Sequence, residues 1–157
     1  MKLYHGTNRD FDRVDLSKSK PNKDFGCGFY LSDDYEQAWN MAQVKVEQLE
    51  TGTPIVQTYE IDDAAWKNLR ILRFENYSEE WAKFILLNRN NPVRLPAHDY
   101  DVVIGPIAND RVGVQLWKYE NRFIDLPILV RNLQYMKGIT IQYFFGTERA
   151  IKSLRRI

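Results

Sequence analysis

The chain has 157 residues, of which 44% are hydrophobic and 13% aromatic. It is therefore long enough to bury a core and does not have the composition of a disordered protein. Twenty-two basic residues against 21 acidic ones leave a net charge of +1, which gives no electrostatic reason to expect wrapping of duplex nucleic acid.

A single cysteine, Cys27, excludes an intramolecular disulfide and fits a reducing compartment. The opening "MKLYHGTNRD" has no apolar secretory segment, and no apolar run approaches the roughly 20 residues that cross a bilayer. We therefore expect one soluble, cytoplasmic domain over residues 1–157, with no membrane partner.

The first half of the chain predicts two strands, a helix and a third strand. The strands are "KLYHGT" (2–7), "FGCGFYLS" (25–32) and, after the helix, "TPIVQTYEID" (53–62). Asp33 followed three residues later by Glu36 forms a capping box, which predicts a helix over 34–50 that Gly52 closes. The apolar face of this helix is expected to comprise Ala38, Met41, Ala42 and Leu49.

The second half predicts shorter elements. A helix is expected over 78–90 with Ser78 as its cap, a buried strand over 100–108, a helix over 126–136, a strand over 138–145 and a last helix from Thr147. The total is five or six strands and three or four helices. Their spacing is too irregular for a βαβ repeat, so the expected class is α+β with a mixed or antiparallel sheet.

Two segments contain candidate binding residues. In "YHGT", the imidazole of His5 can hydrogen-bond a ligand hydroxyl, and Gly6 leaves its backbone open to close approach. In "GCGFYLSDD", Gly28 and its neighbours clear space beside Tyr30, which suits the stacking of a planar ring. The structural alternatives are a histidine bonded at the sheet edge and an ordinary core tyrosine.

Other standard sites are excluded by the sequence. His5 and His98 are far apart and have no cysteine companions, so no metal site is expected. Phosphate-binding "GxxxxGK", dinucleotide "GxGxxG" and hydrolase "GxSxG" patterns are absent. Cys27 has no basic neighbour in sequence that would activate it as a nucleophile, so we interpret it as a small packing residue.

The segment "QYFFGTERA" contains two polar candidates, Gln142 and Glu148. Glu148 is explained as a first-turn acid that complements the dipole of the last helix. Asp110 is interpreted as a cap or loop residue, and the alternative places it or Asn109 at the rim of a pocket. The aromatic residues Trp81, Phe84, Trp117 and Phe123 are expected in the core.

In order and in conjunction, several blocks resemble the ADP-ribosyltransferase superfamily, in the His–Tyr–Glu branch of poly(ADP-ribose) polymerases and diphtheria-type toxins. They are also similar to a bacterial family of small proteins related to those polymerases. The blocks are "YHGT" (4–7), "DFGCGFYL" (24–31), "WAKFILLNR" (81–89), "YDVVIGPIAND" (100–110) and "QYFFGTERAIKSL" (142–154). The resemblance spans almost the whole chain.

This resemblance implies an ADP-ribosyltransferase-like fold with a split mixed or antiparallel sheet flanked by helices. It implies NAD as substrate, no metal, and transfer of ADP-ribose to a protein or nucleic-acid acceptor. Such genes often lie beside small antitoxin-like partners, so it also implies a toxin neutralised by a small protein.

The resemblance also implies roles for particular residues. His5 would bond a ribose hydroxyl, the Gly6 backbone would hold the nicotinamide carboxamide, and Tyr30 would stack on the ring. Thr7 and Gly28 would also contact NAD, and Tyr35 or Trp39 would supply the second face of the ring.

Gln142 falls on the third position of the triad, where the branch has glutamate. An amide keeps the acceptor oxygen and loses the charge, which favours a slower or more acceptor-selective mono-transferase without polymer elongation, with loss of activity as the other outcome. The alternatives are a module that binds NAD or ADP-ribose without turnover and, less well matched, an NAD-dependent RNA 2′-phosphotransferase.

Overall fold

The computed structural model describes residues 1–136 and 138–157, and in these residues seven strands form one sheet. Its order is β4-β5-β6-β2-β1-β3-β7. Neighbouring strands are antiparallel except β4 and β5, which are parallel. The strands are β1 (Lys2–Thr7), β2 (Phe29–Ser32), β3 (Ile55–Glu60), β4 (Ile71–Arg73), β5 (Val102–Pro106), β6 (Ile141–Phe145) and β7 (Arg155–Arg156). The expected α+β class is confirmed, and of the two kinds of sheet that were predicted, mixed or antiparallel, the sheet is mixed and mostly antiparallel.

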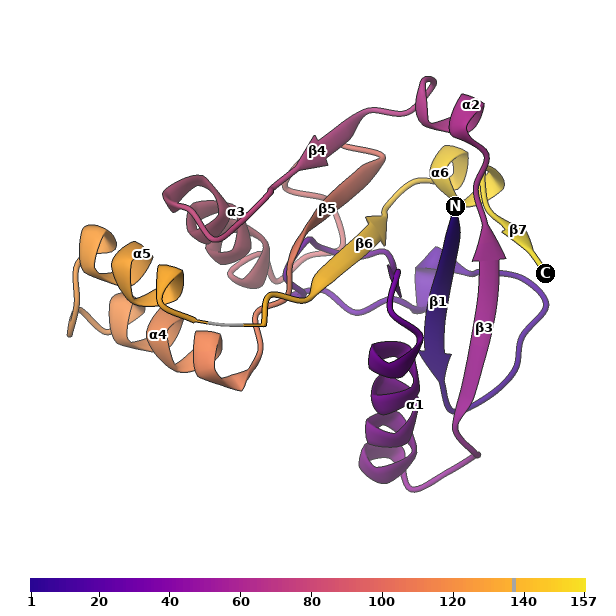
Figure 1. Cartoon of the computed structure of the whole chain (residues 1–157), viewed down its shortest axis with the longest axis horizontal. Coiled ribbons are helices and arrows are strands. Elements are labelled where there is room, and N and C mark those ends of the chain that lie inside the picture. Colours follow the sequence, from indigo (N-terminus) through magenta and orange to yellow (C-terminus); the bar gives the residue numbers. More distant parts are fainter. Residues whose placement is uncertain (137) are drawn as a thin grey trace.

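Six α-helices surround this sheet in the described part of the chain. They are α1 (Tyr35–Leu49), α2 (Asp63–Trp66), α3 (Glu79–Arg89), α4 (Asp110–Glu120), α5 (Leu126–Gln134) and α6 (Glu148–Lys152), with a 3-10 turn η1 (Leu16–Lys18). Figure 1 shows α1 beside β1 and β3, whereas α3, α4 and α5 lie together at the opposite end of the molecule. No helix of residues 1–136 or 138–157 is long and apolar enough to cross a membrane.

The sheet parts between β1 and β2. β1 pairs with β3 over six residue pairs, from Lys2↔Glu60 to Thr7↔Ile55. Between β1 and β2 the register contains the single pair Tyr4↔Ser32. Beyond this pair the backbone groups of the two strands diverge, which leaves space between the two halves of the sheet.

Hydrophobic residues along the central strands alternate between the two faces of the sheet, so each face has its own hydrophobic cluster. In β5 and β6, Val103 and Phe144 pack into one hydrophobic cluster. Their neighbours Val102, Tyr143 and Phe145 pack into a second cluster on the other face. Gln142 is two residues from Phe144, so its side chain leaves β6 on the face of the first cluster.

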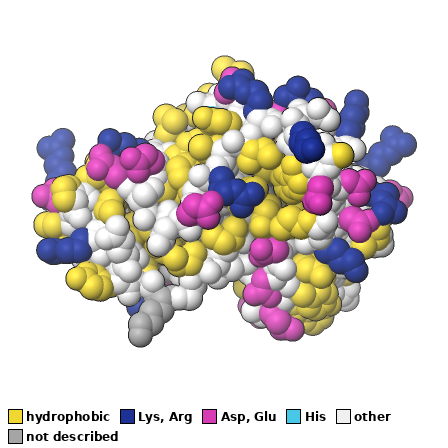
Figure 2. All heavy atoms as spheres, turned by 45° about the horizontal axis from the view of Figure 1, so that its top comes forward, with side chains coloured by type: hydrophobic (Ala, Val, Ile, Leu, Met, Phe, Trp, Pro, Cys, Tyr) yellow, Lys and Arg dark blue, Asp and Glu magenta, His cyan; other side chains and the backbone are white. Residues whose placement is uncertain are grey.

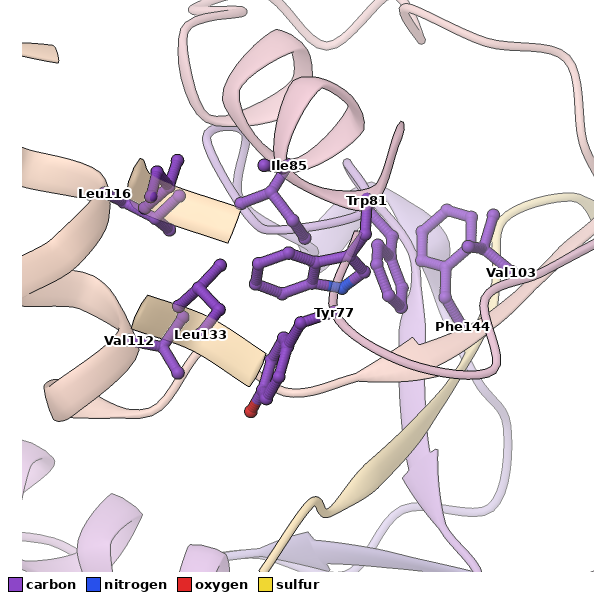
Figure 3. Close-up of a cluster of buried hydrophobic side chains, with 11 residues drawn as sticks. Tyr77, Trp81, Ile85, Val103, Val112, Leu116, Leu133 and Phe144 are labelled. Atoms are coloured by element: carbon purple, nitrogen blue, oxygen red, sulfur yellow. The ribbon is translucent and has the colours of Figure 1, made fainter. Parts of the chain in front are cut away.

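Trp81 is the centre of the first cluster. Its side chain is fully buried, and its indole N–H donates to the carbonyl oxygen of Pro106 at 3.1 Å. Figure 3 shows this indole between Tyr77 and Ile85, with Leu116 and Leu133 of α4 and α5 on one side. Trp81 therefore ties the helical end of the molecule to β5.

The boundaries of α1 differ from those predicted. Asp34, not Asp33, is the N-cap, and its carboxylate accepts from the backbone N–H of Glu36 and Gln37. The helix ends at Leu49, and its C-cap Glu50, two residues before Gly52, adopts the left-handed conformation (φ 49°). Asp33 instead accepts from the Tyr143 hydroxyl at 3.2 Å.

The apolar face predicted for α1 was half right. Ala38 and Ala42 are buried, whereas Met41 and Leu49 are 46% and 55% exposed.

Trp117 and Phe123 were expected in the core, and this prediction was wrong. Their rings stack on each other with centroids 5.5 Å apart, and both side chains remain mostly exposed. Trp117 lies in the last turn of α4 and Phe123 follows the end of that helix, both beyond its two buried residues, Val112 and Leu116.

Candidate functional site

The divergence of β1 from β2 opens a cavity of about 630 Å³. Its walls are β1, β2, the loop before β2, the inner face of α1, and single residues of α3, β6 and the segment after β5. Figure 2 shows acidic and basic side chains interspersed over one face of the molecule. The cavity has a different balance of charge: among the described residues that line it, three are basic and one is acidic. The basic residues are Lys23, Lys45 and Arg89, and the acidic one is Asp24.

Most of the residues predicted for the site line this cavity. His5 and Gly6 come from β1, Gly28 and Tyr30 from β2 and the turn before it, and Gln142 from β6. These segments are far apart in the sequence, and the antiparallel pairing of β2 with β6 joins two of them: Ser32 pairs with Gln142.

Thr7 and Tyr35 are not among the residues that line the cavity. Thr7 is buried and its hydroxyl donates to the carbonyl oxygen of Arg9 at 3.1 Å. Tyr35 is 48% exposed and packs edge-on against Tyr4 with ring centroids 5.5 Å apart. Neither Tyr35 nor Trp39 faces Tyr30 across the cavity; Met41 lines it from α1 instead.

Gly6 and Gly28 stand at positions where close packing leaves no room for a side chain. A Cβ on Gly6 would lie 2.0 Å from the carbonyl oxygen of Ala38, so this glycine lets α1 approach β1 closely. A Cβ on Gly28 would lie 2.1 Å from the ring of Phe144. Both positions therefore require glycine whether or not a ligand binds.

His5 is held as a neutral imidazole. Its Nδ1 lies 2.7 Å from the carbonyl oxygen of Tyr30, so Nδ1 carries the proton and donates it. Burial of the ring against Phe29 (centroids 4.3 Å apart), with the nearby ammonium of Lys45, lowers the pKa of His5 to about 3. Its Nε2 is then a lone-pair acceptor at the cavity.

Lys45 covers the two acceptors at this end of the cavity. Its ammonium donates to the carbonyl oxygen of Gly6 at 2.7 Å and lies 3.5 Å from Nε2 of His5. Burial, with the charge of Lys23, lowers the pKa of Lys45 to about 8. Lys45 was not predicted, although Ala38, Ala42 and Lys45 recur at helical spacing on the face of α1 that meets β1.

Tyr30 lines the cavity with its ring and makes two hydrogen bonds with its hydroxyl. Its hydroxyl donates to the carbonyl oxygen of Gly26 at 2.7 Å and accepts from the backbone N–H of Phe25 at 3.0 Å. Burial, followed by the nearby charge of Asp24, raises the pKa of Tyr30 well above its usual range. The ammonium of Lys23 lies over the ring, 5.1 Å from its centroid, where a cation–π contact is favourable.

Gln142 lies beside an ion pair. Its Nε2 is 3.5 Å from Oδ2 of Asp24, and Oδ1 of the same carboxylate accepts from Nε of Arg89 at 2.7 Å. Next to them, the hydroxyl of Ser32 donates to Oε1 of Gln37 at 2.6 Å. Sequence reasoning missed Asp24 and Arg89, although "DFGCGFYL" and "WAKFILLNR" both carry the resemblance.

The remaining candidates have structural roles. Glu148 lies in the first turn of α6, as expected, with Thr147 as the N-cap. Asn109 is the N-cap of α4, a helix that was not predicted, and accepts from the N–H of Val112. His98 donates from Nε2 to the carbonyl oxygen of Phe25 at 2.8 Å and accepts at Nδ1 from the backbone N–H of Tyr100 at 3.2 Å. The described residues contain no cluster of three acidic, histidine or cysteine side chains that could bind a metal ion.

In a comparison with protein families, residues 1–156 match the model described as "Protein of unknown function (DUF3990)". No curated protein matches the sequence.

Proposed function

The chain belongs to the DUF3990 family over residues 1–156, and we propose that it is an NAD-dependent mono-ADP-ribosyltransferase. ADP-ribose would pass from NAD to a protein or nucleic-acid acceptor, with release of nicotinamide. One observation carries the proposal: His5, Tyr30 and Gln142, which the resemblance places around NAD, come from three different strands and line one cavity. We also propose that the parted sheet is an ADP-ribosyltransferase-like fold.

The size and charge of the cavity support this ligand. Its volume of about 630 Å³ lies in the usual range of small-molecule sites. NAD carries two negative charges on its diphosphate, and Lys23, Lys45 and Arg89 supply an excess of positive charge over Asp24.

The chemistry requires few groups. The bond between the anomeric carbon and the nicotinamide nitrogen breaks, and its electron pair leaves with nicotinamide, so no general acid is needed. The protein must hold the ribose and stabilise positive charge at the anomeric carbon. Nε2 of His5 and Oε1 of Gln142 can each accept from a ribose hydroxyl.

Lys45 must move when NAD binds. In the free protein its ammonium covers Nε2 of His5 and the carbonyl oxygen of Gly6, the acceptors expected for ribose and carboxamide. The cationic nicotinamide ring repels Lys23 and Lys45, whereas the diphosphate attracts them. NAD therefore exchanges a lysine–carbonyl contact for lysine–phosphate contacts.

A binding module that holds NAD or ADP-ribose without turnover is the second candidate, and the neutral amide of Gln142 favours it. Hydrogen bonds to charged groups contribute about 1.5–3 kcal/mol, against about 0.5–1.5 for neutral ones. This module would bind NAD saturably and release no nicotinamide.

The test is release of nicotinamide from NAD by the purified protein. We expect His5→Ala to abolish release and Tyr30→Ala to reduce it at least tenfold. Tyr135→Ala is the matched control, because Tyr135 is 79% exposed and lies outside the cavity lining. Saturable binding without release would establish the binding module instead, and a protein that neither binds nor consumes NAD would refute both.

A further inference from the structure

Gln142, the triad position that has an amide in place of a carboxylate, lies beside the carboxylate of Asp24, which comes from another segment of the chain. Oδ2 of Asp24 is 3.5 Å from Nε2 of Gln142. The Asp24 side chain is 17% exposed and lines the cavity. Among the described residues that line this cavity, it is the one carboxylate.

The contact with Asp24 favours one orientation of the Gln142 amide. A carboxylate oxygen accepts hydrogen bonds, so the amide NH₂ of Gln142 faces Asp24 and its Oε1 faces away from it. Oε1 is then left to accept from a ligand hydroxyl. The negative charge of Asp24 also polarises the amide, which strengthens Oε1 as an acceptor.

Asp24 is held in place from several sides. Nε of Arg89 donates to its Oδ1 at 2.7 Å. The next residue, Phe25, is bonded through its N–H to the Tyr30 hydroxyl and through its carbonyl oxygen to Nε2 of His98. The carboxylate is thus presented by a loop that is fixed before any ligand enters, as electrostatic stabilisation of a transition state requires.

We propose that Asp24 is a catalytic residue, whose carboxylate supplies the negative charge beside the anomeric carbon that the amide of Gln142 lacks. This inference rests on the proposed transferase function. As the bond to nicotinamide breaks and its electron pair leaves with nicotinamide, Asp24 stabilises the positive charge left on the anomeric carbon. The acceptor oxygen or nitrogen then bonds to that carbon, and its proton passes to solvent.

Four proteins test this: wild type, Asp24→Asn, Gln142→Glu and the double variant. We measure kcat and KM for release of nicotinamide from NAD. Asp24→Asn should lower kcat roughly 100- to 1000-fold, as removal of one stabilising group in an active site does. KM should change less than about threefold, because the charge is lost in the transition state.

The double variant gives the sharpest result. Gln142→Glu alone places two carboxylates side by side, where one of them takes up a proton, so kcat should fall below wild type. In the Asp24→Asn background the same substitution restores one charge, and kcat should rise at least tenfold over Asp24→Asn. A merely structural role for Asp24 gives no such reversal.

Asp101→Asn is the matched control. Asp101 is also a buried carboxylate paired with an arginine, Arg149, but it lies outside the cavity lining. Its replacement should lower the melting temperature and leave kcat at the wild-type value. Full activity of Asp24→Asn, or a gain from Gln142→Glu of the same size in both backgrounds, would overturn the inference.

Two failures remain distinguishable. A wild-type protein that releases no nicotinamide refutes the transferase function and this inference with it. An active wild type with an equally active Asp24→Asn refutes the role of Asp24 alone. If Asp24→Asn does not fold, a rise in kcat for Gln142→Glu in the wild-type background would still refute it.

Discussion

Acidification should destabilise the protein through His5. In the folded chain the pKa of this imidazole is about 3, because it is buried and lies beside Lys45. In the unfolded chain it returns to about 6.5. Between these values the unfolded state binds more protons, so stability is full above about pH 6.5 and is lost as the pH falls toward 3.

The magnitude follows from the two pKa values. At pH 4 the pH lies about 2.5 units below the pKa of the imidazole in the unfolded chain, while the folded imidazole is still mostly neutral. At about 1.4 kcal/mol per unit, protonation of the unfolded chain lowers the free energy of unfolding by roughly 3 kcal/mol. Because His5 as a whole residue is half-buried, solvent screens part of this cost, and we expect a loss of about 2–3 kcal/mol between pH 7 and pH 4.

The assay is urea unfolding at several pH values in that interval. His5→Asn is the comparison, because its side-chain NH₂ can still donate to the carbonyl oxygen of Tyr30 but does not titrate. Carboxylates and His98 titrate in both proteins, so the difference between the two pH curves isolates His5. Parallel curves would refute the assignment of His5 as a buried neutral group.

Three further outcomes are expected. Gly6→Ala should lower the free energy of unfolding by about 1–3 kcal/mol, because the added Cβ would overlap the backbone of α1. Chemical denaturation measures this, and a stability equal to that of the wild type would contradict it. Trp81→Ala should cost about 3–5 kcal/mol, because the indole is fully buried in the first cluster; a loss below 1 kcal/mol would mean that the cluster is not packed as described. Lys45→Met should raise the pKa of His5, because it removes a nearby positive charge; an NMR titration that shows no upward shift would contradict the contact.

Elements with strong local signals could be predicted from the sequence. Ser78 and Thr147 cap the helices that were assigned to them, and the apolar run before Pro106 is the buried strand β5. The strands β4 and β7 have three and two residues, too few to show a period, and pairing with distant strands creates them. The helix α4 was missed because Val112 and Leu116 alone mark its buried face.

The site was predictable where a motif places a residue on a strand. The resemblance singled out His5, Tyr30 and Gln142 on such strands, and all three line the cavity. Lys45 and Asp24 come from a helix face and a loop, and they reach the cavity only because α1 packs on Gly6 and because Arg89 of α3 binds the loop. That proximity depends on tertiary packing, which no local pattern in the sequence records.

The central claim is tested most directly with NAD that carries a radioactive label in its adenylate phosphate. The protein is incubated with this NAD and a cell lysate, and two quantities are measured together: free nicotinamide and label bound covalently to macromolecules. A transferase predicts that both appear, that covalent label does not exceed nicotinamide, and that both vanish with His5→Ala. Intact NAD and no covalent label after incubation with the wild-type protein would contradict the account.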